Sequence, residues 1–226
     1  MWRIRRLLRK VIGRDVLATD TASPTRRNKL RLLYLELDEL LLKHIPELRR
    51  KIPRDAAMKR IHDMLELEFG YKFHEIDVKR PWGGYFRIAD DQTKKFLDDF
   101  FPGESMGYNL AQKKKDIKLS PKIMIFMPGK QISWQYHHRR TERWHFLTDG
   151  YFYRSSEDTL PDPTQAHAGE IVQFNEHERH RGGAPAEHYT IVAEVWQHTE
   201  PNEPSDELDV VRLQDDFKRP KHPKRV

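Results

Sequence analysis

Hydrophobic residues recur at helical spacing in two segments of the N-terminal third of the chain. In residues 25–51 they fall three or four positions apart, and Pro46 is expected to kink or split the helix. The second segment covers residues 55–69 and ends at Gly70, a residue type that commonly terminates helices. The two segments predict a helical hairpin over residues 25–72. A leucine-rich stripe of this kind is typical of a core or a subunit interface, so we assign it no chemistry.

The pattern changes after Gly70, where helical spacing gives way to shorter runs. A short helix is predicted at residues 91–101, and an irregular, lysine-bearing loop at residues 106–118. From Ser120 onward, strand-like runs alternate with turns: KIMIFM, ISWQYH, RWHFLT, YFYR, EIVQFN and YTIVAEVW. Several short strands separated by glycine, proline or aspartate predict a β-sandwich or barrel.

The N-terminus is a basic amphipathic segment. Over residues 2–14, apolar side chains fall mostly on one side of a helical wheel and arginines on the other. This pattern fits a membrane-surface anchor, a targeting segment, an arm for an acidic partner, or a terminal helix docked on its own domain or on a neighbouring subunit. With the polar linker that follows, the segment makes a separate unit over residues 1–24.

Composition narrows the class of protein. The chain is 37% hydrophobic and 11% aromatic, enough for a packed core, and 34% of its residues are charged. The absence of cysteine excludes disulfides, thiolate metal sites and cysteine nucleophiles, and it fits an expected cytoplasmic location. No apolar run approaches the ~20 residues that a membrane-spanning helix needs.

The positive charge of the chain is concentrated at its N-terminus. The formal net charge is +6, and residues 1–14 contain six arginine and lysine residues and no acid. The rest of the chain is therefore neutral by the same count, and no nucleic-acid partner is expected. Residues 220–226 form a short basic tail.

The most informative polar pattern is the stretch PGKQISWQYHHRRTERW. Alternate side chains of a strand share a face, so Gln135 and His137 are expected to point the same way. A tight turn would return Glu142 to that face, and a barrel would bring His180 beside them. Such a set suits zinc, iron, manganese, cobalt or nickel, and burying it without an ion would be costly. Taken alone, this spacing of histidines and glutamate does not establish a metal site, because a chain with twelve histidines can match such a pattern by chance.

Several motifs resemble those of known families. Gly129, His137 and Glu142 at their spacing, then Gly169-Glu170 and a strand into His180, resemble the two motifs of the cupin superfamily. More narrowly, four segments resemble the cupin domain of type II mannose-6-phosphate isomerases and the stand-alone relatives labelled phosphoheptose isomerase. These segments are Arg80-Pro81-Trp82-Gly83, residues 135–144 (QYHHRRTERW), residues 178–181 (ERHR) and residues 209–217 (DVVRLQDDF). The resemblance implies a mainly β fold, with a cupin (double-stranded β-helix or jelly-roll) barrel over residues 79–219 preceded by an N-terminal helical region.

The resemblance also implies a metal centre and a reaction. It implies a divalent transition metal (Zn, Mn, Fe, Co or Ni) held by three side chains, those of His137, Glu142 and His180. Gln135 stands where other cupins often place a histidine, so it is either a weak fourth ligand or a residue that orients the ligands. The implied reaction is aldose–ketose interconversion of a phosphorylated sugar, in which a base moves a proton between adjacent carbons. Glu142 is the first candidate for that base, and His145 and His177 are alternatives.

Phosphate recognition needs cations with directed donors. Four arginines lie in the family-like motifs, namely Arg80, Arg139, Arg140 and Arg212. The planar fork of arginine suits a phosphate dianion, although each arginine on its own is equally typical of a surface or ion-paired residue. Trp82 is a further candidate for substrate contact, although packing is the commoner role of such a tryptophan.

Three functions fit these observations. They are a metal-dependent sugar-phosphate isomerase, a cupin module that binds a sugar phosphate or carbohydrate without turning it over, and a cupin dioxygenase. The Arg-Pro-Trp-Gly and Val-Val-Arg-Leu segments favour the isomerase, because they resemble one isomerase branch rather than cupins in general. A homodimer is expected by analogy with barrels of this type. The sequence specifies neither the sugar nor the metal.

Overall fold

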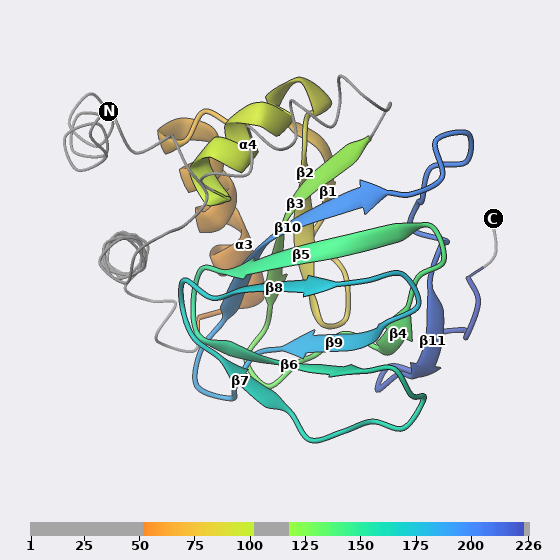
Figure 1. Cartoon of the computed structure of the whole chain (residues 1–226). Coiled ribbons are helices and arrows are strands. Elements are labelled where there is room, and N and C mark those ends of the chain that lie inside the picture. The colour runs from red at the N-terminus through yellow and green to blue at the C-terminus, as the bar shows by residue number, and fades with distance from the viewer. Residues whose placement is uncertain (1–51, 102–117, 224–226) are drawn as a thin grey trace, which may run out of the picture.

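The computed structural model describes residues 52–101 and 118–223 as helices packed on two β-sheets (Figure 1). The helical elements are α3 (Arg54–Asp63), the π-helix η2 (Met64–Glu68), the 3-10 turn η3 (Asp90–Gln92) and α4 (Thr93–Phe100). The basic segment 1–24, the predicted helix 25–51 and all but the last residue of the predicted loop 106–118 lie outside the described residues.

Eleven strands in the described part of the chain form two antiparallel sheets. The six-stranded sheet has the order β1 (Phe73–Asp77), β2 (Gly83–Ile88), β3 (Leu119–Phe126), β10 (Thr190–His198), β5 (Arg140–Phe146) and β8 (Ile171–Phe174). The five-stranded sheet has the order β11 (Val211–Gln214), β4 (Trp134–Tyr136), β9 (Arg179–Gly183), β6 (Gly150–Ser155) and β7 (Thr164–Ala166). Many neighbours, such as β3 and β10, are distant in sequence, so the sheets bring remote residues together.

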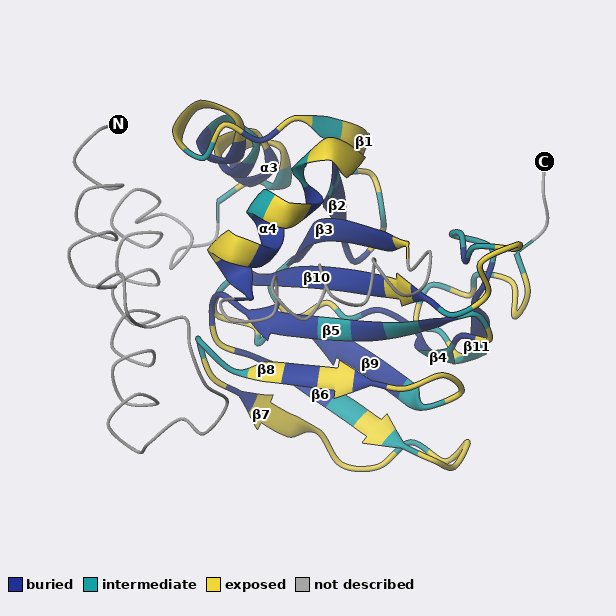
Figure 2. Ribbon diagram, turned by 45° about the horizontal axis from the view of Figure 1, so that its top comes forward, coloured by how far each residue is buried: buried dark blue, intermediate teal, exposed yellow. Residues whose placement is uncertain are grey.

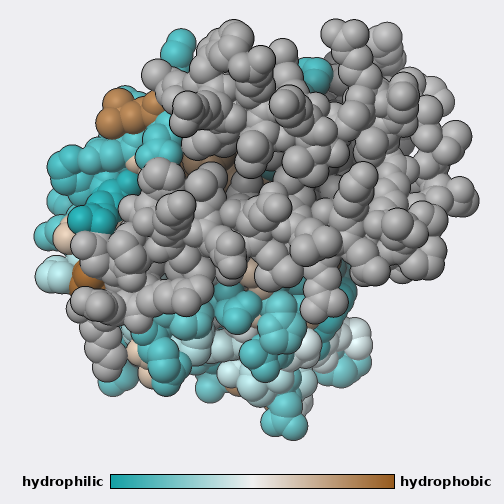
Figure 3. Space-filling view, turned by 90° about the vertical axis from the view of Figure 1, so that its left-hand side faces the viewer, coloured by the Kyte–Doolittle hydropathy of each residue, from teal (hydrophilic) through white to brown (hydrophobic). Residues whose placement is uncertain are grey.

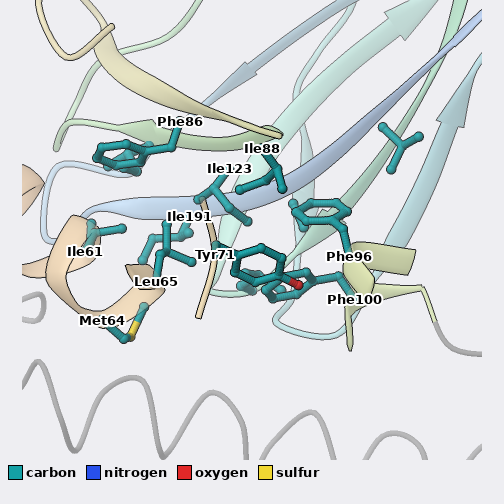
Figure 4. Close-up of a cluster of buried hydrophobic side chains, with 14 of the residues drawn as sticks. Ile61, Met64, Leu65, Tyr71, Phe86, Ile88, Phe96, Phe100, Ile123 and Ile191 are labelled. Atoms are coloured by element: carbon teal, nitrogen blue, oxygen red, sulfur yellow. The ribbon is translucent and has the colours of Figure 1, made fainter. Parts of the chain in front are cut away.

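The six-stranded sheet is covered on both faces, and its central strands are therefore almost wholly buried (Figure 2). On β3, Ile123 and Ile125 belong to the cluster under the helices, whereas Met124 and Phe126 belong to the cluster between the sheets. Figure 4 shows the cluster under the helices, where side chains from helical elements and strands meet: Ile61, Met64, Leu65, Phe96, Phe100, Phe86, Ile123 and Ile191.

The core between the sheets is aromatic and ends in polar residues. The ring of Trp144 is wholly buried and meets Phe146 and Phe174 edge-on. Its indole Nε1 donates to Glu142 Oε2 at 3.1 Å and to Glu194 Oε1 at 2.9 Å. Trp144 therefore marks the boundary between apolar packing and a buried polar site.

The mainly β, cupin-type barrel predicted from the sequence is confirmed by these two facing antiparallel sheets. All six strand-like runs coincide with strands, which are β3, β4, β5, β6, β8 and β10. The helix expected at residues 55–69 is formed by α3 and η2, and the helix expected at residues 91–101 by η3 and α4.

The hydrophobic pattern does not reveal β1, β2, β7, β9 and β11. Strand β9 has the sequence RHRGG, with no alternating apolar residues to mark it. It is nevertheless buried, because Gly182 lets the Trp144 ring pack against its backbone, and a Cβ at that position would lie 2.6 Å from the ring. Arg181 is satisfied in the interior by Ile132 O at 2.8 Å and by Asp216 Oδ1 at 3.0 Å.

The described surface is polar. The large hydrophobic residues exposed on it are Leu67, Ile76 and Ile171, and they lie on different elements. Described residues visible in Figure 3 are mostly hydrophilic, with isolated hydrophobic ones. Among the helices that the structure describes, none has both the length and the apolar character needed to cross a membrane.

Candidate metal centre and its cavity

Three strands place the two histidines and the glutamate at one point between the sheets. His180 lies on β9 opposite Gln135 of β4, and His137 follows β4 directly. Glu142 lies on β5, in the other sheet, opposite Trp196 of β10. The group therefore joins the two sheets at the polar end of the inner core.

The three side chains are close together and almost inaccessible. His137 Nε2 lies 3.2 Å from Glu142 Oε1, and His180 Nε2 lies 3.2 Å from Glu142 Oε2. One ligand atom from each residue falls within 4.8 Å of the others, and none of the three residues is more than 2% exposed. This spacing could hold one metal ion.

Backbone carbonyls fix which imidazole nitrogens face the carboxylate. His137 Nδ1 donates to Asp209 O, and His180 Nδ1 donates to Glu178 O at 2.9 Å. A carbonyl only accepts, so each Nδ1 carries the proton, and each Nε2 of a neutral ring presents its lone pair to Glu142. Within the described residues, His180 Nε2 has no hydrogen-bond partner. A cation placed beside the buried carboxylate would satisfy this lone pair, so the three residues fit a divalent metal.

The electrostatics of the site favour the ligand-forming charge states. Burial, and then the neighbouring Arg140 guanidinium, lowers the pKa of His137 to about 3, so this imidazole is neutral. Burial alone would raise the pKa of Glu142, but the groups around it, of which the Arg140 guanidinium is the permanent cation, hold that pKa well below its usual range. The carboxylate is therefore ionised at neutral pH.

Gln135 lies beside this group. Its Nε2 is 3.3 Å from His137 Nε2, and its Oε1 accepts from Ser133 Oγ at 2.6 Å. The residue therefore adjoins the ligand set, with its carbonyl oxygen engaged by a neighbouring hydroxyl, and this placement fits an orienting role.

A cavity of about 60 Å³ adjoins the candidate metal centre. Five basic and three acidic residues contribute to its wall: Arg80, Lys122, Arg140, Arg212, Arg219, Glu142, Glu194 and Glu207. Its other polar and apolar lining includes Gln135, His137, Trp82 and Trp196. A space of this size holds a few water-sized groups, so it suits the oxygen-bearing part of a ligand.

Two donors in the cavity wall have neither a hydrogen-bond acceptor nor an ion-pair partner among the residues that the structure describes. Trp196 is 6% exposed, and its Nε1 has no hydrogen-bond acceptor among the described residues. The same holds for the buried Nε of Arg212, whose Nη1 donates to Pro220 O at 2.9 Å. Unsatisfied buried donors are costly, so both point to an acceptor-rich ligand.

The predicted substrate-binding residues are not equivalent in the structure. Arg80, Arg212 and Trp82 line the cavity, and Arg80 also pairs with Asp77 at 2.8 Å. Arg139 does not contribute to the cavity wall, and its guanidinium pairs with Glu203.

Arg140 does line the cavity, but its guanidinium is already held by protein groups. Its Nε donates to Glu142 Oε1 at 2.8 Å, and its Nη1 donates to Ser205 Oγ at 2.8 Å. A phosphate would have to compete with these acceptors.

The alternative bases lie away from the cavity. His145 projects from β5 to the opposite face of the sheet, where its Nδ1 donates to Phe100 O at 2.6 Å and its ring meets Phe101. Burial lowers the pKa of His145 to about 4. His177 is exposed in the turn before β9, where its ring lies 5.0 Å from that of His138. The structure brings neither imidazole to the metal centre.

Sequence reasoning missed four charged residues of the cavity: Lys122, Glu194, Glu207 and Arg219. Two of them carry a detectable signal, since a single charge interrupts the apolar runs KIMIFM and TIVAEVW. Lys122 and Glu194 are directly opposite each other on β3 and β10. Lys122 also pairs with Glu207 and lies 3.2 Å above the ring of Trp196.

Glu194 is an acidic residue of the cavity wall whose carboxyl is protonated at neutral pH. Burial, and then the nearby charge of Glu142, raises the pKa of Glu194 to about 8. Its Oε1 shares the indole N–H of Trp144 with Glu142. Glu194 therefore places a carboxyl that holds its proton at neutral pH beside the candidate metal centre.

Comparisons with known proteins found partial likenesses to solved structures. No family model matches it, and no curated protein does. Solved structures that resemble it include a Cupin 2 conserved barrel domain protein from Salinispora arenicola, at 20% identity and a TM-score of 0.30 over 34% of this chain and 61% of that one. The capsular polysaccharide assembling protein CapF from Staphylococcus aureus is 14% identical, with a TM-score of 0.40 over 62% of this chain and 34% of that one.

A third is a conserved protein with a double-stranded β-helix domain from Klebsiella pneumoniae, 13% identical, with a TM-score of 0.34 over 43% of this chain and 71% of that one. The chain spans less than two thirds of the length of the first two proteins. Such likenesses say nothing about activity or substrate, and the resemblance to mannose-6-phosphate isomerases stays a prediction. The direct basis for the cupin-type fold is the two-sheet topology of the chain itself.

Proposed function

We propose that the chain is a metal-dependent isomerase that interconverts the aldose and ketose forms of a phosphorylated sugar. One observation carries this proposal. The cavity that reaches His137 and Glu142 is also lined by Arg80 and Arg212. An open-chain sugar phosphate has carbonyl and hydroxyl oxygens at one end and a dianion at the other, and this cavity offers a partner for each.

The chain's own residues would bind and orient such a ligand. A divalent ion held by His137, Glu142 and His180 supplies Lewis acidity for the sugar carbonyl when it is bound. Arg80 and Arg212 provide charged donors for the phosphate, and Arg212 Nε has no hydrogen-bond partner in the described part of the chain. Trp196 Nε1, which has no acceptor within residues 52–101 and 118–223, is a donor for a sugar oxygen.

Glu194 is the residue we assign to proton transfer between adjacent sugar carbons. It lines the cavity, is 3% exposed and is hydrogen-bonded to Trp144, so it has a fixed position beside the ligand group. Glu142 is a weaker candidate, because a carboxylate that ligates a metal has less basicity to offer. A carboxyl that titrates near neutral pH is suited to give and to take a proton.

The test is isotope exchange in D2O. The full chain is loaded in turn with Zn2+, Mn2+ and Co2+, incubated with hexose and heptose phosphates, and assayed for deuterium at C2 by NMR. We expect exchange with at least one phosphorylated sugar, and loss of exchange in Glu194→Gln with metal binding retained. Absence of exchange with every sugar phosphate and every metal contradicts the proposal.

A matched pair of arginine variants tests the phosphate site. Arg212→Gln is expected to raise KM for the phosphorylated sugar while leaving the unphosphorylated sugar unaffected. Arg139→Gln is the control, because Arg139 pairs with Glu203 and does not contribute to the cavity wall. Equal effects of the two substitutions would contradict the assignment of Arg212.

A second function, binding of a sugar phosphate without turnover, is favoured by one observation. The Arg140 guanidinium already contacts two of the three candidate ligands, His137 and Glu142. A site neutralised in this way could bind an anion at the remaining cations without a metal. Saturable binding of a sugar phosphate to metal-stripped protein, with no exchange after metal is added, would support this function over the isomerase.

A further inference from the structure

Arg140 is a buried cation built into the candidate metal centre. It is 4% exposed, and its Nη1 donates to Ser205 Oγ at 2.8 Å and to Asp206 O at 3.1 Å. Its guanidinium carbon lies 3.5 Å from the centre of the Trp196 ring. These partners are not candidate metal ligands, so they fix the position of the guanidinium independently of the ligand set.

From this position the guanidinium reaches two of the three candidate ligands. Its Nε donates to Glu142 Oε1 at 2.8 Å, and its Nη2 lies 3.1 Å from His137 Nε2. Nη2 has only hydrogens to offer, and His137 Nε2 is the nitrogen without a proton, because Nδ1 donates to Asp209 O. The contact is therefore a hydrogen bond from Nη2 to the lone pair of Nε2.

Gln135 Nε2, at 3.3 Å, is a second and more distant donor to this lone pair, and a metal ion on His137 Nε2 would displace both donors. A metal ion bound to His137 Nε2 and the hydrogen bond from Arg140 Nη2 exclude each other. We propose that Arg140 is an internal competitor for the metal, which weakens divalent-ion binding at His137, Glu142 and His180 and gives up its Nη2 donor when the ion binds. The proposal deepens the proposed function, because it names the residue that controls loading of the same site.

The exchange has a consequence for the ligand. Nη1 and the stacked face of the guanidinium keep their partners when Nη2 is released, so Arg140 does not have to leave the cavity wall. The released N–H then faces the cavity, where it is available to an oxygen of the substrate. Binding of the metal ion to His137 Nε2 and release of the Arg140 Nη2 donor are thus coupled through the lone pair of that nitrogen.

Calorimetric titration of the metal-stripped full chain with Zn2+, without substrate, tests the competition. Arg140→Gln is expected to bind Zn2+ more tightly than the wild type by about tenfold or more, the scale on which residues behind metal ligands act. Arg139→Gln removes the same charge one residue away, outside the cavity wall, and is expected to change the affinity little. Equal or weaker binding by Arg140→Gln would overturn the proposal, because Arg140 would then act only to orient the ligands.

A measurement on the wild type covers the case in which Arg140→Gln fails to fold. In 15N NMR spectra that resolve side-chain nitrogens, Zn2+ is expected to change the chemical shifts of Arg140 Nη2 and His137 Nε2 over the same range of Zn2+ concentration. Coordination at His137 Nε2 with an unshifted Arg140 Nη2 would overturn the proposal. Neither test uses a sugar. If Arg140→Gln binds Zn2+ more tightly than the wild type and Arg139→Gln does not, the competition is supported even if the isotope-exchange test of the isomerase fails.

Discussion

At the scale of single residues, Asp209 organises the turn that carries the candidate ligands. Its carbonyl accepts from His137 Nδ1, and its carboxylate accepts from the backbone N–H groups of His138 and Arg139, each at 3.1 Å. Ser205 Oγ also donates to this carboxylate, at 2.6 Å. One residue thus fixes both the tautomer of a ligand and the backbone that leads to Glu142.

Asp209→Asn should therefore weaken the metal centre without touching a ligand. An amide can accept with only one of its two polar atoms, so at least one of the backbone donors loses its partner. We expect the free energy of unfolding to fall by about 1–3 kcal/mol, measured by urea denaturation, and Zn2+ affinity to fall with it. Asp98→Asn, at an exposed Lys94 pair, is the control and should have little effect. Unchanged affinity in Asp209→Asn would show that the turn does not depend on this carboxylate.

Glu194 gives the stability of the metal-stripped protein a specific pH dependence. The folded-state pKa of about 8 lies above the ordinary glutamate value of 4.5, so between these two pH values the folded state holds a proton that the unfolded state releases. This contribution to stability is complete below pH 4.5 and is lost as the pH rises through 8. Urea denaturation between pH 5 and 8.5 should show a decline in wild type that is flatter in Glu194→Gln. Parallel curves for the two proteins would contradict the assigned protonation state.

At the scale of elements, the loop before β2 joins the helical layer to the cavity. Arg54, at the start of α3, donates from Nη2 to Arg80 O at 2.7 Å and to Gly83 O at 2.6 Å. The same loop carries Arg80 and Trp82 into the cavity wall. The backbone of the Arg-Pro-Trp-Gly motif is therefore fixed by hydrogen bonds from α3, a helix that lies outside the family-like sequence motifs.

Gly83, the first residue of β2, cannot be replaced without moving the sheet. Its φ is +149°, and a Cβ there would lie 1.8 Å from Ile125 O on β3. We expect Gly83→Ala to lower the free energy of unfolding by about 3 kcal/mol or more. Gly70→Ala is the matched control, since Gly70 also has positive φ (+69°) but has nothing within 4 Å of the added methyl group. That variant should lose only about 1–2 kcal/mol, and equal losses in thermal or urea unfolding would contradict the steric explanation.

The elements also show what the sequence could predict. The runs around Ile123 and Ile191 are apolar because β3 and β10 are covered on both faces, and such strands are easy to find. Strand β9 has no such pattern, because its burial depends on Gly182 under Trp144 and on the internal partners of Arg181. The helical segments α3–η2 and α4 could be predicted from the periodicity of their apolar residues.

The candidate site was accessible only in part, for a related reason. His137, Glu142 and His180 occur in recognisable motifs, and the structure brings them together. Lys122 and Glu194 enter the cavity because β3 and β10 are neighbours, and that pairing cannot be read from either strand alone. The face of His145 likewise depends on which side of β5 the helices cover.

At the scale of the whole molecule, positive charge is placed where the proposed ligand needs it. The chain beyond residue 14 has no net formal charge, yet five basic residues face three acidic ones around the cavity. Glu194 is protonated at neutral pH, which leaves the cavity more positive still. Two sheets and a C-terminal segment converge to build this wall, so the site depends on the complete described fold.

The account depends most directly on whether His137, Glu142 and His180 bind one divalent ion. The measurement is the metal content of the full chain after loading with Zn2+ and removal of excess ion, by elemental analysis. We predict one ion per wild-type chain that is lost in His180→Ala and retained in His138→Ala, because the His138 imidazole is exposed and does not line the cavity. Retention of that ion in a folded His180→Ala protein, or equal loss in both variants, would contradict it.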